Sequence, residues 1–226
     1  MKSHKTAAII AAGGSSSRMG FDKLMAEIAG EKVLFKTISA FEKCDDIDEI
    51  IIVTRTALIG ELKAELKTQS FKKLKTIVSG GETRQKSVYN GVLACSDDVR
   101  LLCIHDGARP LVTDEVIKNA LKAAIEYGAA TAAVAVKDTI KRGENKIITE
   151  TLPRENLYQI QTPQVFDKQL YLSAYKAAKS DYSDDCQLIE AMGGKVALSM
   201  GDYHNIKLTT NEDFAVAEIF LRQMED

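Results

Sequence analysis

The sequence predicts an α/β fold in which helices cover both faces of a mostly parallel β-sheet. The first observation is that short apolar runs lack the apolar–polar alternation of strands that expose one face to water. The second is that amphipathic stretches with helical spacing separate these runs along the chain. With 226 residues, 45% of them hydrophobic, the chain is long enough to form a single domain that spans residues 1–226.

Each element follows from the local pattern, taken in chain order. Five apolar runs are expected to be strands: 6–12, 49–54, 75–79, 100–105 and 131–136. Apolar residues at helical spacing predict four helices in the intervening stretches: 33–44, 58–68, 85–94 and 115–127. Beyond residue 164, the same criteria predict helices over 168–179, 185–192 and 212–224 and a strand over 195–199.

Residues 137–164 interrupt this alternation. Two polar, β-branched segments flank the turn-forming residues Gly143, Glu144 and Asn145, which is typical of a β-hairpin with few core residues. We expect this hairpin to project from the globule as a β-arm. Because an isolated two-stranded ribbon is only marginally stable in water, the arm needs a partner surface, and a second copy of the chain is the simplest one. The sequence therefore predicts a homodimer formed through the 137–164 arm.

Composition excludes several classes of function. The formal net charge is −2 and there is no long basic block, so we expect no nucleic-acid partner. No apolar segment is long enough to span a membrane, and the short apolar run near the N-terminus does not fit a secretory signal, so we expect no membrane association. The cysteines lack the close spacing of metal ligands: Cys44, Cys95, Cys103 and Cys186. We interpret them as reduced thiols in a cytoplasmic protein.

A loop of small residues follows the first predicted strand, with the sequence AAGGSSSRMGFDK from Ala11 onward. Gly13 and Gly14 permit close approach of the backbone to a ligand, and successive N–H groups there are able to surround phosphate oxygens. Arg18 and Lys23 add a guanidinium fork and an ammonium group. The stretch lacks both the dinucleotide fingerprint and the P-loop ending, and a mobile surface turn is the alternative interpretation.

Two later groups of polar residues also follow predicted strands. Gly81, Arg84 and Ser87 stand at a strand-to-helix turn, where a helix N-terminus favours anions, although a capping turn is the alternative. Asp106 and Arg109 follow the strand predicted over 100–105, and Asp106 is either a hard oxygen ligand for a divalent cation or a turn former. The cations beside predicted loops are Arg18, Lys23, Arg84, Arg109, Arg154 and Lys207. One phosphate does not require so many cations, so the set fits two anionic substrates held side by side.

Five motifs in a fixed order resemble the 2-C-methyl-D-erythritol 4-phosphate cytidylyltransferases, enzymes of the non-mevalonate isoprenoid pathway. These motifs are the glycine-rich loop with its R-M and K, then GGETRQKSV, HDGARP, QTPQVF and NIKLT. The resemblance covers about residues 7–218, nearly the whole chain. It implies a Rossmann-like sheet of the nucleotide-diphospho-sugar transferase type, with a protruding β-arm that locks a homodimer.

The resemblance also implies a reaction. CTP and a sugar-alcohol phosphate, 2-C-methyl-D-erythritol 4-phosphate, would give the CDP-linked product and pyrophosphate, with Mg²⁺ as the cofactor. The nucleophile would be an oxygen of a phosphate monoester, which is largely ionised at neutral pH because its second pKa is about 6. A general base is then unnecessary, and we expect His4, His105 and His204 to have structural roles.

Site residues carry over from the family by motif. The resemblance implies catalytic roles for Arg18, Lys23, Arg154 and Lys207. It implies substrate-binding roles for Ala12, Gly13, Gly14, Gly81, Glu82, Ser87, Asp106, Arg109, Thr139, Thr162, Ser183 and Asp184. The segment 12–23 would hold the triphosphate, and Gly81, Glu82 and Ser87 would bind cytosine and ribose. Asp106 would hold the metal or the substrate hydroxyls. The acceptor would bind at Thr139, Arg154 and Lys207, with the arm residues supplied by the other subunit.

Two departures from the family pattern keep alternatives open. Ser16 replaces a glycine of the family loop, and only four residues separate Arg18 from Lys23. This loop is similar to that of molybdenum-cofactor nucleotidyltransferases, whereas the remaining motifs are shared with ribitol-5-phosphate cytidylyltransferases. A non-catalytic nucleotide-binding subunit is a further alternative, but it would have little reason to retain Arg18, Lys23 and Asp106 together.

Overall fold

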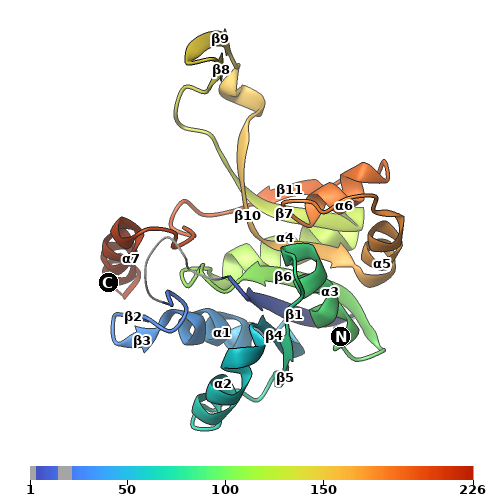
Figure 1. Cartoon of the computed structure of the whole chain (residues 1–226), viewed down its shortest axis with the longest axis vertical. Helices are drawn as coiled ribbons and strands as arrows, with labels where there is room; N and C mark the ends of the chain where they lie inside the picture. The colour runs from blue at the N-terminus through green and yellow to red at the C-terminus, as the bar shows by residue number, and fades with distance from the viewer. Residues whose placement is uncertain (1–3, 15–21, 226) are drawn as a thin grey trace.

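One seven-stranded sheet forms the centre of the protein. The computed structural model describes residues 4–14 and 22–225, and the strand order is β11-β7-β10-β6-β1-β4-β5 (Figure 1). The strands are β1 Lys5–Ala12, β4 Glu49–Thr54, β5 Leu74–Ser79, β6 Val99–Asp106, β7 Ala129–Ala135, β10 Tyr158–Asp167 and β11 Ala197–Met200. Neighbouring strands run parallel, except that β10 is antiparallel to both β6 and β7. The predicted mostly parallel sheet is confirmed.

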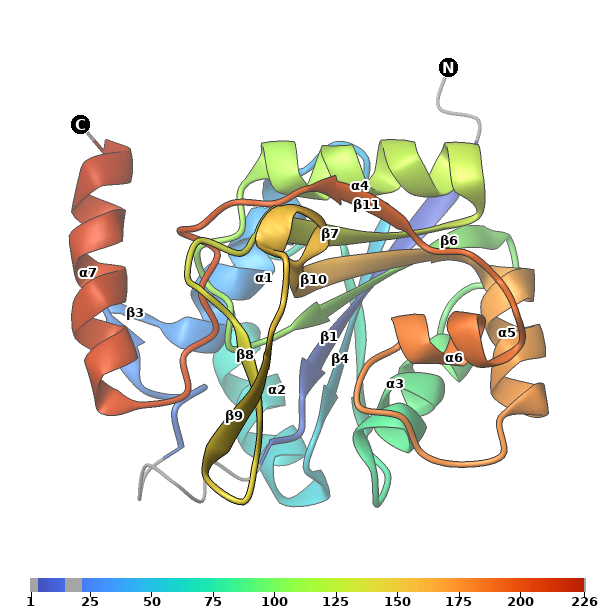
Figure 2. The same ribbon diagram turned by 90° about the horizontal axis from the view of Figure 1, so that it is seen from above.

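Helices cover both faces of the sheet, as Figures 1 and 2 show. They are α1 Val33–Lys43, α2 Ile59–Leu66, α3 Arg84–Leu93, α4 Asp114–Tyr127, α5 Lys168–Ala177, α6 Cys186–Ala191 and α7 Asn211–Glu225. Side chains of α1, α2, α4 and α7 join one core cluster, whereas those of α3, α5 and α6 join a second. A short ribbon of β2 (Glu27–Ile28) and β3 (Glu31–Lys32) precedes α1. Every helix and strand predicted outside 137–164 forms within two residues of its expected bounds.

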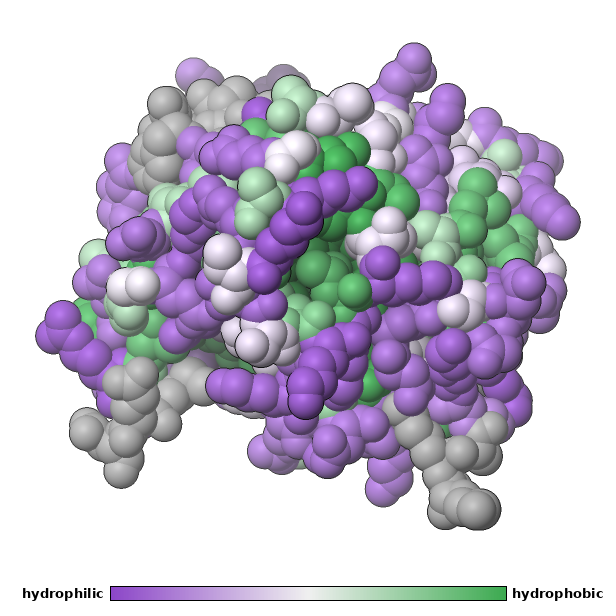
Figure 3. All heavy atoms as spheres, turned by 90° about the horizontal axis from the view of Figure 1, so that it is seen from below, coloured by the Kyte–Doolittle hydropathy of each residue, from purple (hydrophilic) through white to green (hydrophobic). Residues whose placement is uncertain are grey.

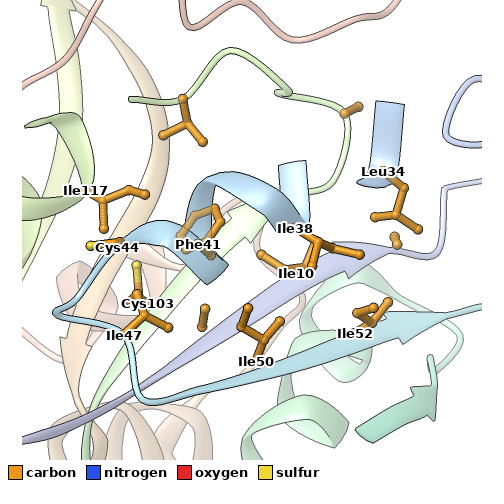
Figure 4. Close-up of a cluster of buried hydrophobic side chains, with 14 of the residues drawn as sticks. Ile10, Leu34, Ile38, Phe41, Cys44, Ile47, Ile50, Ile52, Cys103 and Ile117 are labelled. Atoms are coloured by element: carbon orange, nitrogen blue, oxygen red, sulfur yellow. The ribbon is translucent and has the colours of Figure 1, made fainter. Parts of the chain in front are cut away.

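Burial on both faces explains why the strands lack alternation. Successive residues of β1 point to opposite faces, and Ile9 and Ile10 are both fully buried, in different core clusters. On the α1 face, Ile38 and Phe41 lie over Ile10 and its β4 neighbours (Figure 4). The core therefore holds the strands from both sides, and their carboxyl ends form a rigid platform.

The predicted hairpin forms the projecting arm. β8 (Lys141–Glu144) pairs antiparallel with β9 (Ile147–Thr151), and every residue of the two strands is exposed. Asn145 and Lys146 make the turn with φ of 50° and 67°, both in the left-handed region that two-residue hairpin turns require. The arm rises away from the sheet in Figure 1, and in Figure 2, seen from above, its strands β8 and β9 lie in front of the sheet.

The C-terminal bound predicted for the arm was wrong. Residues 158–164 belong to β10, which lies between β6 and β7 in the main sheet, rather than to the arm. The chain leaves β7, forms the arm and returns directly, so β10 must run antiparallel to β7, because a parallel return would need a crossover. Tyr158 is paired with Ala135, which places both stems of the arm side by side.

The four cysteines are buried, and the surface shown in Figure 3 is mainly polar. Cys44, Cys95, Cys103 and Cys186 are all buried free thiols, and burial raises the pKa of Cys44 and of Cys95 to about 12. In the described part of the chain, no helix combines the length and apolar character that a membrane span requires. The face opposite the arm is mainly hydrophilic, and its hydrophobic residues gather near the centre (Figure 3).

Candidate functional site

The site lies at the edge of the sheet where the parallel strands end. β1, β4, β5 and β6 run in one direction, so their carboxyl ends meet, and ligands of open α/β sheets bind outside such ends. Backbone hydrogen bonds tie the loops together, from Gly107 N–H to the Ala11 carbonyl at 2.9 Å and from Gly80 N–H to the Thr54 carbonyl at 2.8 Å. Asp106, the last residue of β6, stands at the centre of this edge.

Three cations surround the Asp106 carboxylate. Lys207 Nζ lies 2.7 Å from Oδ2, Arg84 NH2 lies 3.6 Å from Oδ1, and Arg109 Nε lies 3.9 Å from Oδ2. Burial alone would raise the pKa of Asp106, but the attraction of Lys207, Arg84 and Arg109 outweighs it and lowers that pKa well below its usual range. The carboxylate is therefore ionised at neutral pH, and it brings together Arg109, three residues away, with Arg84 and Lys207, which are distant in sequence.

Asp185 is a member of this network that the sequence analysis missed. Its Oδ2 accepts a hydrogen bond from Arg84 NH1 at 2.5 Å, and its Oδ1 accepts one from the Tyr171 hydroxyl at 3.0 Å. Burial would lower the pKa of Arg84, but the Asp185 and Asp106 carboxylates raise it. The predicted Asp184 instead accepts a hydrogen bond from Gln187 N–H, in the first turn of α6, at 3.0 Å. The sequence shows two adjacent aspartates, Asp184 and Asp185, and only the fold shows that Asp185 is the one bonded to Arg84.

A segment before α7 provides backbone acceptors for two of the predicted cations, Arg109 and Lys23. Arg109 NH1 donates to the Asn205 carbonyl at 2.6 Å, and Lys23 Nζ donates to the Leu208 carbonyl at 2.7 Å. Burial lowers the pKa of Arg109, although the Asp106 carboxylate opposes this effect. The structure thus brings Lys23, Asp106, Arg109 and Lys207 together at one edge of the sheet.

The glycine-rich loop is described only in part. Ala12 is buried at the end of β1, and its carbonyl accepts a hydrogen bond from the Thr54 hydroxyl at 3.1 Å. At Gly13 and Gly14, an added Cβ would meet no atom of the described residues within 4 Å. The predicted residue Arg18 lies outside the described residues.

The loop after β5 is built around Ser87. Ser87 Oγ accepts from Gly81 N–H at 2.9 Å and donates to the Thr83 carbonyl at 2.8 Å. An added Cβ at Gly80 would lie 2.8 Å from the same Oγ, so the close approach requires glycine at that position. Glu82 is exposed beside this turn. The predicted nucleoside-binding residues Gly81, Glu82 and Ser87 therefore form one turn at the N-terminus of α3.

Other predicted residues lie elsewhere. Thr139 and Arg154 are exposed on the arm, where Arg154 NH1 donates to the Lys137 carbonyl at 2.7 Å. Ser183 is exposed before α6, and its N–H donates to Gln187 Oε1 at 3.1 Å. Within the described chain, the structure gives none of these residues a contact with Asp106.

Thr162 reaches the site from β10. Its Oγ1 accepts a hydrogen bond from Asp106 N–H at 3.1 Å and contacts His105 Nδ1 at 3.0 Å. Burial lowers the pKa of His105 to about 4, so the imidazole is neutral at physiological pH. The expectation that His105 is structural agrees with its complete burial, but the sequence did not reveal its contacts.

One carboxylate of the site is suited to a divalent cation. Asp106 is ionised and partly accessible, and it offers the hard oxygen ligand that Mg²⁺ prefers. In the described residues, no group of three or more His, Cys, Asp or Glu side chains forms a metal-binding cluster. A Mg²⁺ ion held by Asp106 would have to receive most of its other ligands from substrate phosphates and water.

The chain matches known proteins over almost its full length. A family model described as 2-C-methyl-D-erythritol 4-phosphate cytidylyltransferase matches residues 6–223. Proteins of that name from Caldanaerobacter subterraneus subsp. tengcongensis and Alkaliphilus oremlandii are 46% and 42% identical, and each alignment covers 96% of this chain and at least 95% of the relative.

Solved structures agree with this match. A 4-diphosphocytidyl-2C-methyl-D-erythritol synthase from Anaerococcus prevotii superposes with a TM-score of 0.87 at 33% identity, covering 97% of this chain and 99% of that one. The 2-C-methyl-D-erythritol 4-phosphate cytidylyltransferase from Thermus thermophilus superposes with a TM-score of 0.78 at 30% identity, covering 96% and 99%. The Rossmann-like expectation is thereby confirmed. The chain belongs to the 2-C-methyl-D-erythritol 4-phosphate cytidylyltransferase family.

Proposed function

We propose that this chain is a nucleotidyltransferase that joins CTP to 2-C-methyl-D-erythritol 4-phosphate, yielding the CDP-linked methylerythritol and pyrophosphate for isoprenoid precursor synthesis. The observation that carries the proposal is the ring of Lys207, Arg84 and Arg109 around Asp106 at the carboxyl edge of the sheet. Two crowded anionic substrates need such a concentration of fixed cations. Family membership identifies the two substrates.

The chemistry requires positioning rather than a base. The acceptor phosphate carries the nucleophilic oxygen, which is largely ionised at neutral pH because the second pKa of a phosphate monoester is about 6. That oxygen attacks the α-phosphorus of CTP in line, forming a P–O bond as the bond to the pyrophosphate leaving group breaks. The protein then has to align the two phosphates and neutralise their charge. His105 is buried and neutral, and it is not needed as a base.

Each group of site residues has a part in this scheme. Arg18 and Lys23, with the Ala12–Gly14 backbone, bind the triphosphate and stabilise charge on the α-phosphate. Gly81, Glu82 and Ser87 bind the nucleoside at the turn before α3, while Arg109 and Lys207 face the acceptor phosphate. Support for this division comes from the 2.6–2.7 Å contacts of Lys23, Arg109 and Lys207, which hold all three cations beside one edge.

We assign Mg²⁺ to the same edge. Asp106 would hold the ion together with triphosphate oxygens, and the bound ion supplies charge neutralisation at the phosphates. Lys207 Nζ lies 2.7 Å from the same carboxylate and holds it in place. A cytoplasmic location fits the four buried free cysteines, which reducing conditions preserve.

The arm supports a homodimer. Ile147 and Ile148 are 70% and 65% exposed on a ribbon that has no core of its own, which favours burial against a second copy. In that dimer, Thr139 and Arg154 serve the partner's site. Light scattering tests the dimer: the double change Ile147→Asp and Ile148→Asp should give monomers, whereas Val216→Asp, a change at an exposed valine of α7, should not. A fully active monomeric wild-type protein would remove this part of the proposal.

Site sharing has its own test. Arg154→Ala and Lys207→Ala variants should each lose activity alone. Mixed heterodimers contain one intact composite site, so re-associated mixtures should recover about a quarter of wild-type activity, given a two-fold symmetric dimer. No recovery in a mixture that does exchange subunits would show that each arm serves its own chain.

A pyrophosphate-release assay tests the reaction itself. CTP should support release with 2-C-methyl-D-erythritol 4-phosphate and not with ribitol 5-phosphate or without acceptor. Release with ribitol 5-phosphate alone would assign the other cytidylyltransferase activity. Faster release with GTP and a molybdopterin acceptor would assign a molybdenum-cofactor nucleotidyltransferase activity. No release with any pair of substrates would favour a non-catalytic nucleotide-binding subunit.

A further inference from the structure

His105 lies between two site residues, Asp106 and Arg109, but is itself fully buried. It is the penultimate residue of β6, it is fully buried, and its ring packs at a tilted angle on Phe41 with centroids 4.9 Å apart. Both ring nitrogens have partners: Nδ1 lies 3.0 Å from Thr162 Oγ1, and Nε2 lies 3.1 Å from the Arg109 carbonyl oxygen. Buried polar groups are normally hydrogen-bonded, and both ring nitrogens of His105 meet this requirement.

The partners determine where the protons lie. The Arg109 carbonyl only accepts, so His105 Nε2 must carry the proton and donate it. In the neutral ring Nδ1 is then an acceptor, and the Thr162 hydroxyl must donate to it. The same hydroxyl oxygen accepts Asp106 N–H at 3.1 Å. The chain of hydrogen bonds therefore has one direction, from Asp106 N–H through Thr162 and His105 to the Arg109 carbonyl.

Asn205 closes this chain into a ring. Its side-chain Nδ2 donates to the backbone carbonyl of Thr162 at 2.8 Å. Its backbone carbonyl accepts from Arg109 NH1 at 2.6 Å. Arg109 is thus held at both ends, by His105 at its backbone and by Asn205 at its guanidinium. The ring joins the end of β6 and the middle of β10, which are neighbouring strands, to the segment before α7.

We propose that His105 is a positioning residue of the transferase, holding the backbone of Asp106 through Thr162 and the backbone of Arg109 directly. This inference rests on the proposed function, because the expected changes are in KM for the acceptor, which Arg109 faces, and in kcat, which depends on Asp106. A single hydrogen bond of this kind is worth about a five- to tenfold change in an equilibrium.

Two variants separate the two ring nitrogens. The side-chain amide of Asn reaches the position of Nδ1, so His105→Asn keeps an acceptor for Thr162 and loses the bond to the Arg109 carbonyl. The longer amide of Gln reaches the position of Nε2, so His105→Gln keeps that donor and leaves the Thr162 hydroxyl without its acceptor. Thr162→Val removes the hydroxyl at nearly constant volume, and His4→Asn, at the far end of the sheet, is the control.

The expected results differ between the variants. His105→Asn should raise KM for the acceptor about tenfold and change KM for CTP less than twofold, since Arg109 faces the acceptor. His105→Gln and Thr162→Val should lower kcat about five- to tenfold and speed amide hydrogen exchange at Asp106, which His105→Asn should leave protected. His4→Asn should match the wild type. Values within twofold of wild type in all three site variants, or equal losses in every parameter, would overturn the proposal.

Two readouts do not depend on activity. Imidazole nitrogen chemical shifts of the wild-type protein at pH 7 should show His105 protonated at Nε2 alone. The Nδ1–H tautomer or the doubly protonated ring would overturn the proposal. This measurement needs no variant, so it holds even if every variant fails to fold. Amide exchange at Asp106 is the second. If the wild type released no pyrophosphate with any acceptor, the proposed function would fail, whereas the ring of hydrogen bonds would still be tested by these measurements.

Discussion

Gly91 and Gly60 allow one substitution to be tested in two helices with opposite expected effects. At Gly91 in α3, an added Cβ would lie 2.6 Å from Ile9 Cγ2 and 2.7 Å from Val53 Cγ2. Ile9 and Val53 are fully buried on β1 and β4, so neither side chain has room to move. At Gly60 in α2, an added Cβ would meet no described atom within 4 Å.

The magnitude follows from these distances. For the approach to lengthen from 2.6 Å to an ordinary 3.4 Å, α3 must move away from β1 by 0.8 Å. Overpacking of this kind costs about 1–3 kcal/mol, and the gain in helix propensity returns at most about 1 kcal/mol. Gly91→Ala should therefore lower the free energy of unfolding by up to about 2 kcal/mol. Gly60→Ala should raise it by about 0.5–1 kcal/mol.

Urea unfolding followed by far-UV circular dichroism measures both changes, and this probe is needed because the chain has no tryptophan. The m-values should stay equal, so that shifts in midpoint report stability alone. Because α3 carries Ser87, Gly91→Ala should also raise KM for CTP, and Gly60→Ala should not. Equal stability of the two variants, or a Gly91→Ala protein more stable than the wild type, would contradict the expected clash of α3 with β1 and β4.

Three further predictions concern charge. Lys23→Ala, like Arg18→Ala, should lower turnover by about 10²–10³ with the fold intact, as loss of one transition-state donor does, and unchanged turnover in pyrophosphate release would contradict the triphosphate role. Asp106→Asn leaves three cations without their shared carboxylate, so the free energy of unfolding should fall by about 3 kcal/mol in urea titrations, and equal stability would contradict the network. The pKa of Glu49 is lowered because its contacts with Ser96, Lys75 and Lys5 outweigh the opposing effect of burial, so Glu49→Gln should cost about 2 kcal/mol at pH 7. That cost is fully present above the unfolded-state pKa of about 4.3 and should shrink as pH falls below it. A constant difference between pH 7 and pH 3 would show that the Glu49 charge contributes nothing.

Local pattern predicted most of the fold because burial on both faces leaves a direct trace in composition. The continuous apolar run of β4 and the helical spacing of α1 each needed only neighbouring residues to be recognised. β10 was missed because its first three residues are exposed and its buried half includes Gln161, Thr162 and Gln164, polar side chains whose hydrogen bonds become visible only in the fold. A polar buried strand does not differ in sequence from a loop.

The site was predictable where a residue's type and its strand end were sufficient. Asp106 and Arg109 were expected from their place after an apolar run, and the structure brings them to within 3.9 Å. Asp185 was missed because its partner Arg84 lies far away in sequence, and no local signal separates it from Asp184. His105 was recognised as buried, yet its two partners come from Thr162 and Arg109 through tertiary contacts.

The paired stems of the arm have a consequence for the independence of the globule. Ala135 and Tyr158 are ladder partners, and Val136 N–H donates to the Leu157 carbonyl at 3.0 Å, so the chain enters and leaves the arm through adjacent backbone positions. We therefore expect that a tight turn joining β7 to β10 at this point would leave the sheet intact. The arm depends on the fold for its position, whereas the fold is expected to form without the arm.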